Sequence, residues 1–196
     1  YPEGCAMSTV TLITGGARSG KSAYGEALAL ELGGSSVLYI ATAVATDPEM
    51  EQRIQAHRAR RPADWTTEER AADFGALKNS DLFQHADAVL LDCIGFALNN
   101  TLYHGLSDWD RPDAEQMKNL EGSVSKDLRD LIDLCREEGK SLILITNEVG
   151  DGLIPSSSVS RMYRDALGRI NCLAAALADQ VVLMTCGIPL TLKEPR

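Results

Sequence analysis

The sequence predicts an α/β fold of three layers, in which helices cover both faces of a mainly parallel central sheet. Runs rich in apolar and β-branched residues have the length of buried strands and lie at 9–14, 36–41, 88–92, 141–146 and 180–185. Helical patterns separate most of these runs, and strands that alternate with helices form parallel sheets. Ligands of such sheets bind beyond the carboxyl ends of the strands. We therefore expect the functional residues at that edge.

The first predicted strand, 9–14, leads into the sequence G-G-A-R-S-G-K-S at 15–22. This segment matches the phosphate-loop pattern, in which backbone N–H groups surround phosphate oxygens, Lys21 reaches the β- and γ-phosphates, and the Ser22 hydroxyl binds Mg²⁺. A helical pattern follows at 23–32 and ends at Gly33 and Gly34. A glycine-rich turn before a capped helix is the alternative. The strand before the loop and the helix after it favour a three-layer P-loop NTPase-like fold that binds a nucleoside triphosphate.

The second predicted strand, 36–41, is followed by a segment with capping-box spacing, 46–49, that predicts a helix through His57. Arg58, Arg60 and Arg61 come directly after this histidine. A neutral imidazole beside fixed positive charges could attack a phosphorus atom and form a phosphoramidate. The alternative is a solvated cluster that complements the helix dipole, and spacing alone favours that alternative.

The third predicted strand ends in a carboxylate, Asp92, which in phosphate-loop enzymes commonly holds Mg²⁺. After the fourth strand, Glu148 could orient a ligand or be solvated, and the sequence does not separate the two. The segment 146–149 does not fit the N-K-x-D element, which argues against a regulatory GTPase. Trp65 is interpreted as a packing anchor, and the arginines of 161–169 as partners of Asp165 within one helix. The polar segment 108–119 is predicted to be a surface loop.

Composition limits the class of protein. The chain has 196 residues, 44% of them hydrophobic, and a net charge of −9. This length predicts a single P-loop nucleotide-binding catalytic domain over 8–196, preceded by an added or upstream extension over 1–7. The negative charge argues against nucleic-acid binding. Without a membrane-length apolar run or a signal peptide, we expect no stable membrane insertion and a cytoplasmic location. The scattered cysteines are expected to be reduced and mostly buried.

Together these motifs resemble the bifunctional adenosylcobinamide kinase and adenosylcobinamide-phosphate guanylyltransferase family of cobalamin biosynthesis, commonly called CobU or CobP. The resemblance covers most of 11–187 and rests on several motifs in one order. They are T-G-G-A-R-S-G-K-S at 14–22, V-L-Y-I-A-T at 37–42, E-M-x-x-R-I-x-x-H at 49–57, R-P-x-x-W at 61–65 with Glu69 following, L-L-D-C-I at 90–94, T-N-E-V-G at 146–150 and R-x-x-R-D-x-x-G-R-x-N at 161–171. The chain departs from the enterobacterial form at Asp92, where that form has glutamate, and at Ala56, where it has a second histidine.

The resemblance implies that His57 is the guanylylated nucleophile and that Lys21 assists phosphoryl transfer. It implies ATP and GTP as nucleotide substrates, Mg²⁺ as cofactor held by Ser22 and Asp92, adenosylcobinamide and its phosphate as acceptors, and a homotrimer. The nucleotide contacts that the resemblance and the phosphate-loop pattern imply are Thr14, Gly15, Gly16, Ala17, Arg18, Ser19, Gly20, Lys21, Ser22, Ala41, Thr42, Ala43, Arg58, Ala59, Arg60, Arg61, Glu69 and Asp92.

Two other functions fit the phosphate loop. A small-molecule or nucleoside kinase would transfer only the γ-phosphate and leave His57 idle. A nucleotide-gated binding module would bind ATP without turnover.

Overall fold

The computed structural model describes residues 8–45 and 48–195, except for the side chains of Arg53 and Arg60. The predicted extension 1–7 and the predicted capping residues Thr46 and Asp47 lie outside these ranges. Within them, one seven-stranded sheet has the order β3-β2-β4-β5-β1-β6-β7. Its strands are β1 (Val10–Gly15), β2 (Val37–Ala41), β3 (Thr66–Glu69), β4 (Ala88–Asp92), β5 (Ser141–Ile145), β6 (Gln180–Thr185) and β7 (Ile188–Lys193).

The strands from β1 to β6 pair in parallel, and β7 is antiparallel to β6. The five strands expected from the sequence are β1, β2, β4, β5 and β6, and each begins and ends within one residue of its predicted bounds. The prediction of a three-layer P-loop NTPase-like fold with a mainly parallel sheet is confirmed.

Two edge strands, β3 and β7, were not predicted. β3 has the sequence TTEE, without an apolar residue, and β7 contains Pro189 and is mostly exposed. Edge strands need no apolar face, and proline and charged residues are common in them because one side of the strand pairs with nothing. Hydrophobic periodicity therefore gives no signal for β3. In β7, Ile188, Leu190 and Leu192 stand at every second position, a strand pattern that the sequence analysis missed.

The helices connect the strands and differ from the prediction in one place. They are α1 (Lys21–Gly33), α2 (Pro48–Arg60), the 3₁₀ helix η1 (Phe74–Asn79), α3 (Asp81–Gln84), α4 (Ile94–Gly105), α5 (Ala114–Glu137) and α6 (Ser158–Leu177). The predicted loop 108–119 is wrong in its second half, because α5 begins at Ala114. The Asp113 side chain caps that helix by accepting a hydrogen bond from the Gln116 N–H at 2.8 Å.

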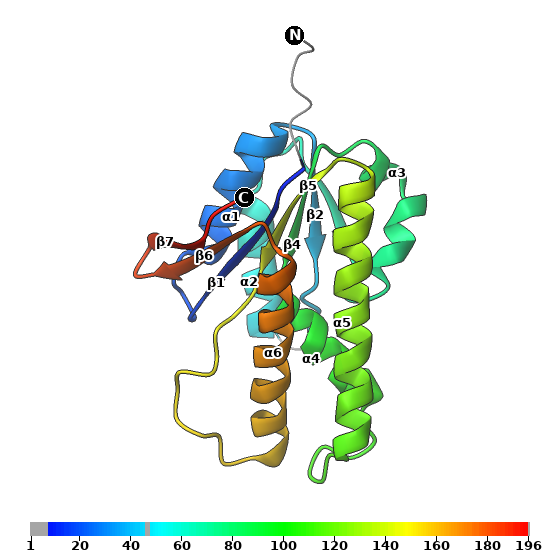
Figure 1. Ribbon diagram of the computed structural model, residues 1–196, viewed down its shortest axis with the longest axis vertical. Helices are drawn as coiled ribbons and strands as arrows, with labels where there is room; N and C mark the ends of the chain where they lie inside the picture. The colour runs from blue at the N-terminus through cyan, green and yellow to red at the C-terminus, as the bar shows by residue number, and fades with distance from the viewer. Residues whose placement is uncertain (1–7, 46–47, 196) are drawn as a thin grey trace.

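Each face of the sheet has its own apolar core. On one face, side chains such as Leu12, Leu91 and Leu144 pack with α4, α5 and α6. On the other face, Ile13, Leu90 and Ile145 belong to the cluster that packs against α1. Figure 1 shows α5 and α6 on one side of the sheet and α1 on the other. Alternate residues of each strand thus face different helices, as in a sheet buried on both sides.

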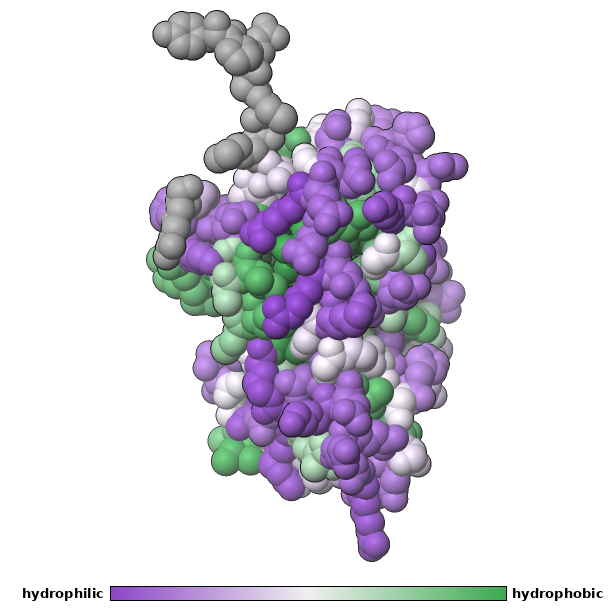
Figure 2. Space-filling view, turned by 45° about the vertical axis from the view of Figure 1, so that its right-hand side comes forward, coloured by the Kyte–Doolittle hydropathy of each residue, from purple (hydrophilic) through white to green (hydrophobic). Residues whose placement is uncertain are grey.

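The carboxyl edge of the sheet is the lower edge in Figure 1, where α4 and the N-terminal part of α6 extend beyond the strands. On the face seen in Figure 2, hydrophilic side chains predominate and apolar side chains form separate patches. In the parts of the chain that the structure describes, no helix combines the length and apolar character of a membrane span.

Candidate functional site

The phosphate loop lies between the end of β1 and the start of α1, at the carboxyl edge of the sheet. Gly20, which precedes the helix, has φ of 96°, a left-handed conformation that glycine adopts without strain. Gly15 has φ of 150°, and a Cβ there would lie 2.4 Å from the Met184 carbonyl oxygen. The Lys21 ammonium donates to the Gly16 carbonyl at 2.7 Å, so the loop is closed by its own lysine.

Two polar groups of this loop are buried. Ser19 Oγ has no hydrogen-bond partner among the described residues, although it is shielded from solvent. A buried hydroxyl of this kind is suited to a ligand oxygen that supplies the missing bond. Burial lowers the pKa of Lys21, and the nearby Cys93 and Asp92 oppose that shift. Lys21 is therefore within electrostatic reach of the carboxylate that ends β4.

The second part of the site is a small pocket between α2 and the carboxyl ends of β2 and β4. His57, Arg61 and Asp92 all line it. The predicted residues Ala41 and Ala43 line it as well. Residues from two separate parts of the sequence, the His57 cluster and the end of the third predicted strand, thus line one cavity. The Asp92 charge also acts on the pKa of the phosphate-loop lysine.

The pocket also has residues that the sequence analysis missed. Met50, Ile54 and His57 are spaced by four and three residues, which places them on one face of α2, and Arg61 follows just beyond the end of that helix. This periodicity was readable in the sequence. Phe96 and Tyr39 complete the lining. Tyr39 lies within an apolar strand, and the pattern of that strand indicates a position in the core, so the sequence gives no signal that this residue lines a pocket.

Tyr39 contacts the two charged side chains, Asp92 and Arg61, that line this pocket together with His57. Its hydroxyl donates to Asp92 Oδ2 at 2.8 Å, and the guanidinium carbon of Arg61 lies 3.4 Å from the centre of its ring. Burial, followed by the nearby Asp92, raises the pKa of Tyr39 well above its ordinary value. The phenol is therefore a neutral hydrogen-bond donor at physiological pH.

Other predicted contact residues lie around the pocket. Arg58 and Glu69 form an ion pair with each other, and both side chains are more than half exposed. Ala59 is exposed, and the side chain of Arg60 is outside the described part of the structure. Thr42 is buried, and its hydroxyl bonds to the backbone of Cys93. The structure therefore places Thr42 beneath the pocket, where it supports the neighbouring residues.

The structure tests two further expectations and shows a local contact of Glu148. Trp65 is buried and donates to the Gly34 carbonyl at 3.0 Å, which confirms it as a packing anchor. Glu148 accepts a hydrogen bond from the Gly150 N–H and so closes its own turn. The expected pairing within α6 is wrong, because Arg169 binds Glu121 of α5 through two 2.8 Å hydrogen bonds. Intrahelical spacing could not reveal a partner on another helix.

The donors present fit Mg²⁺ when nucleotide phosphates complete its coordination. Among the described residues, no cluster of three His, Cys, Asp or Glu side chains could hold a metal by itself. Mg²⁺ usually takes one or two protein ligands and fills the remaining positions with phosphate oxygens and waters. Asp92 Oδ1 accepts no hydrogen bond from the described residues, so one carboxylate oxygen is open to a cation. Ser22 begins α1 beside the phosphate loop.

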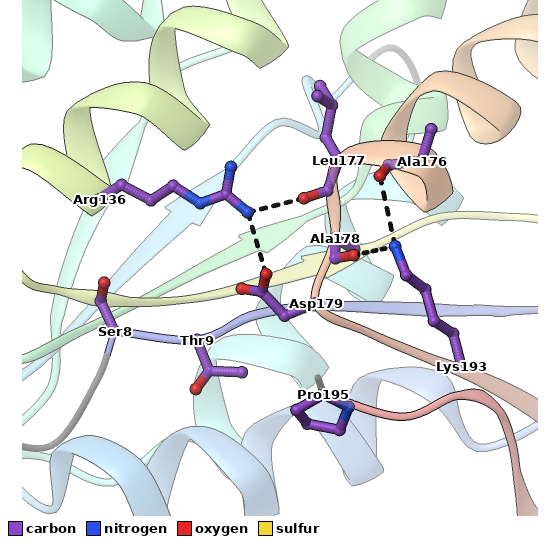
Figure 3. Close-up of a pocket in the computed structure, with 9 residues that line it drawn as sticks. All are labelled: Ser8, Thr9, Arg136, Ala176, Leu177, Ala178, Asp179, Lys193 and Pro195. Carbon is purple, nitrogen blue, oxygen red and sulfur yellow. Dashed lines mark hydrogen bonds and ion pairs between the residues drawn. The ribbon is translucent and has the colours of Figure 1, made fainter.

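A wider pocket at the opposite edge of the sheet has a structural explanation (Figure 3). Its two cations bind the C-terminal end of α6. Lys193 donates to the Ala176 carbonyl at 3.3 Å, and Arg136 donates to the Leu177 carbonyl at 2.8 Å and to Asp179 at 3.1 Å. Cations at a helix C-terminus stabilise its unpaired carbonyls. This pocket is thus at the edge of the sheet opposite the phosphate loop, and its Arg136 and Lys193 already have partners.

Comparisons with known proteins agree with this arrangement. The family model of cobinamide kinase / cobinamide phosphate guanyltransferase, CobU, matches residues 11–192. The bifunctional adenosylcobalamin biosynthesis protein CobU of Escherichia coli K12 is 40% identical over 183 residues, which cover 93% of this chain and 98% of that protein. The protein of the same name from Salmonella typhimurium is 40% identical over 93% of this chain and 98% of its own length.

A CobP protein of the same description from Pseudomonas aeruginosa is 38% identical over 94% of this chain and 98% of its own length. Among solved structures, a KaiC-like protein from Pyrococcus horikoshii OT3 aligns with a TM-score of 0.49 and 13% identity, over 90% of this chain and 72% of that one. The family match covers nearly all the described residues, including the phosphate loop and the His57 pocket. The chain therefore belongs to the CobU family of cobinamide kinases and cobinamide phosphate guanyltransferases, and it is an enzyme of cobalamin biosynthesis.

Proposed function

We propose that this enzyme phosphorylates adenosylcobinamide with ATP or GTP and then transfers GMP from GTP to adenosylcobinamide phosphate through a guanylyl-histidine at His57. The observation that carries the proposal is the pocket in which His57, Arg61 and Asp92 meet. A nucleophile, a fixed cation and a carboxylate are the groups that nucleotidyl transfer through a covalent intermediate requires. The products are adenosylcobinamide-GDP and pyrophosphate.

In the proposed kinase step, the acceptor hydroxyl of adenosylcobinamide attacks the γ-phosphorus and releases its proton to solvent, and the bond from that phosphorus to the bridging oxygen of the nucleoside diphosphate breaks. The backbone N–H groups of 15–20 hold the phosphates, and Lys21 offsets negative charge on the transferring group. Ser22 and Asp92 would hold Mg²⁺, which when bound neutralises phosphate charge. Because the ammonium of Lys21 is partly buried, less water screens its charge, and its attraction to a phosphate is stronger.

In the proposed transferase step, an unprotonated nitrogen of His57 attacks the α-phosphorus of GTP. A P–N bond forms, the P–O bond to the leaving group breaks, and pyrophosphate departs. A phosphate oxygen of adenosylcobinamide phosphate then attacks the same phosphorus, and the P–N bond breaks to regenerate the histidine. Two displacements replace one difficult transfer. Arg61, in the same pocket, would bind the phosphate oxygens in both displacements.

The remaining predicted contacts belong to the same proposal. We assign nucleotide contacts to Thr14 and the phosphate loop, to Ala41 and Ala43, and to Arg58, Arg61 and Glu69. A cytoplasmic homotrimer is also part of the proposal. It is supported by exposed apolar side chains that a second copy would cover, including Ile188 and Leu190 of β7, exposed at 64% and 53%. Sedimentation of the purified protein tests the trimer.

The test of the covalent step uses GTP labelled separately at the α- and γ-phosphates. The protein is incubated with Mg²⁺ and either GTP, denatured and assayed for acid-labile label. We expect α-label on the wild type, none on His57→Ala, and full labelling of His85→Ala. His85 is a matched control because it is exposed and its Nδ1 lies 2.7 Å from the Asp81 carbonyl oxygen, away from the pocket.

If folded wild-type protein with measurable kinase activity retains no α-label, the covalent mechanism is wrong and a simple P-loop kinase is the better account. Membership of an enzyme family already argues against the other alternative, a binding module without turnover.

A further inference from the structure

Tyr39 lies between two groups that the proposed function uses, and the sheet register explains how it reaches both. On one side it pairs with Thr67 of β3, and on the other with Leu90 of β4. Residues two apart on a strand share a face, so Asp92 lies diagonally from Tyr39 on the face where the tyrosine side chain points. The two atoms that meet are the phenol oxygen and Asp92 Oδ2, 2.8 Å apart.

This hydrogen bond restricts the Asp92 carboxylate. Tyr39 is only 2% exposed and is held within the apolar core, so its hydroxyl has a fixed position. Asp92 Oδ2 is occupied by that hydroxyl, while Oδ1 accepts no hydrogen bond from the described residues. The carboxylate is thereby turned so that one particular oxygen is available to a ligand.

The ring of Tyr39 supports the second group, Arg61. The guanidinium carbon lies 3.4 Å above the ring centre, which is close contact for a cation on an aromatic face. Arg61 NH1 also donates to Thr67 Oγ1 at 3.2 Å. Its Nε is buried and has no hydrogen-bond partner in the ranges that the structure describes. Within the described part of the chain, the guanidinium is thus held by a stack and one hydrogen bond, with a buried donor still unsatisfied.

We propose that Tyr39 is a positioning residue that holds the cation-binding carboxylate with its hydroxyl and the phosphate-binding guanidinium with its ring. The inference rests on the proposed function, which assigns those roles to Asp92 and Arg61. It separates the tyrosine into two parts with different tasks. The hydroxyl serves the metal, and the ring, together with Thr67, serves the nucleotide phosphates.

Three substitutions separate these tasks. Tyr39→Phe removes the hydroxyl and keeps the ring. Thr67→Val removes the second anchor of Arg61, and Thr67 is exposed, so the fold tolerates the change. Tyr39→Leu removes both the hydroxyl and the stack. Tyr163→Phe is the matched control, because it removes another partly buried tyrosine hydroxyl, which donates to the Gly95 carbonyl at 3.1 Å.

Two binding measurements that need no turnover report separately on metal binding and on nucleotide binding. Mn²⁺ binding in the presence of a non-hydrolysable GTP analogue is followed by electron paramagnetic resonance, and nucleotide binding is followed with fluorescent mant-GTP at saturating metal. We expect Tyr39→Phe to weaken Mn²⁺ binding about fivefold and to leave mant-GTP binding unchanged, since a hydrogen bond to a charged group is lost. Thr67→Val should weaken mant-GTP binding about threefold and leave Mn²⁺ binding unchanged. Tyr39→Leu should weaken both.

The positioning role would be overturned if folded Tyr39→Phe bound Mn²⁺ and folded Thr67→Val bound mant-GTP with the same midpoints as the wild type. It would also be overturned if Tyr163→Phe weakened binding as much as these two substitutions do. Thermal melts of each variant check that it is folded, and if Tyr39→Leu does not fold, the other two substitutions decide. Failure of the proposed function has a different signature. In that case wild-type protein carries no α-label on His57, while the shifted Mn²⁺ midpoint of Tyr39→Phe can still be measured.

Discussion

The hydroxyl of Thr42 forms hydrogen bonds with both backbone groups of Cys93. It accepts from the Cys93 N–H at 2.7 Å and donates to the Cys93 carbonyl at 2.8 Å. Thr42 itself is 0% exposed, and its own carbonyl accepts a 2.6 Å hydrogen bond from the Asn100 side chain. One side chain thus ties the segment after β2 to the turn after β4. Because Ala43 and Asp92 flank these two residues, the contact fixes two walls of the His57 pocket.

Thr42→Val should destabilise the protein by about 1–3 kcal/mol, because it leaves the N–H of Cys93 buried without a partner, while the Cys93 carbonyl keeps its hydrogen bond from the Ala97 N–H. Valine has nearly the same shape, so the loss reports the hydroxyl. Urea denaturation measures the free energy of unfolding. Thr42→Ser keeps the hydroxyl and should lose much less; an equal loss in the two variants would contradict the role given to the hydrogen bonds.

Gly15→Ala should cost more than about 2 kcal/mol of stability, and Gly16→Ala much less. A Cβ on Gly15 would meet the Met184 carbonyl oxygen at 2.4 Å and Ser19 Oγ at 2.8 Å, whereas one on Gly16 would meet nothing within 4 Å. The contact at Gly15 is with backbone, which cannot move aside without shifting β6. Paired thermal melts of the two variants check the difference, and similar melting temperatures would show that the loop yields at Gly15.

Lys21→Ala should lower the rate of γ-phosphoryl transfer about 10²- to 10³-fold, as removal of one charged group from a phosphate site typically does. The Lys21 ammonium bonds to Gly16 within the loop itself, so the rest of the fold should survive the change. Lys126→Ala is the control, since that lysine is exposed and pairs with Asp130 on the surface of α5. Turnover with labelled ATP measures both. A Lys21→Ala enzyme with wild-type turnover would exclude the proposed catalytic role.

The cysteines should differ in reactivity. Burial raises the pKa of both the Cys93 and Cys135 thiols to about 12, while Cys172 and Cys186 are exposed. Because the thiolate is the reactive form, iodoacetamide at pH 8 should modify Cys172 and Cys186 in the native protein and spare the buried pair. Peptide mass spectrometry before and after denaturation checks this pattern. The expectation of mostly buried cysteines is thus met by two of the four described ones.

The same thiols give stability a pH dependence. Unfolded thiols ionise near their ordinary pKa of 9.0, whereas the folded ones stay neutral up to a pKa of about 12. Between these two pKa values the unfolded thiols have lost their protons and the folded thiols have kept them, so the unfolded state is favoured as the pH rises. The stability linked to these thiols is therefore complete below pH 9 and is lost progressively between pH 9 and 12. The urea midpoint should fall over this window, and it should fall less steeply in Cys135→Ala. An identical slope in the variant would contradict the assignment.

Local sequence accounts for most of the scaffold. The five inner strands are continuous apolar runs, because both faces of each strand are covered by helices. The phosphate loop was also predictable, since its glycines, lysine and serine are each required by one local task. The edge strand β3 was not predictable, because it has no apolar face that would impose a pattern on the sequence. The edge strand β7 has apolar residues at every second position, and the sequence analysis missed them.

For the candidate site, the residues proposed to carry chemistry were selected from the chain alone: the loop 15–22, His57 with its arginines, and the aspartate that ends β4. Which of them meet became known only from the folded arrangement. Parallel strands bring Asp92 beside Tyr39 and within electrostatic reach of Lys21, and β3 supplies Thr67 to Arg61. The fold also pairs Arg169 with Glu121 across two helices and buries the Thr42 hydroxyl against Cys93. The difference arises because chain periodicity reports which face of an element is buried, whereas the partner on that face is set by strand order and register.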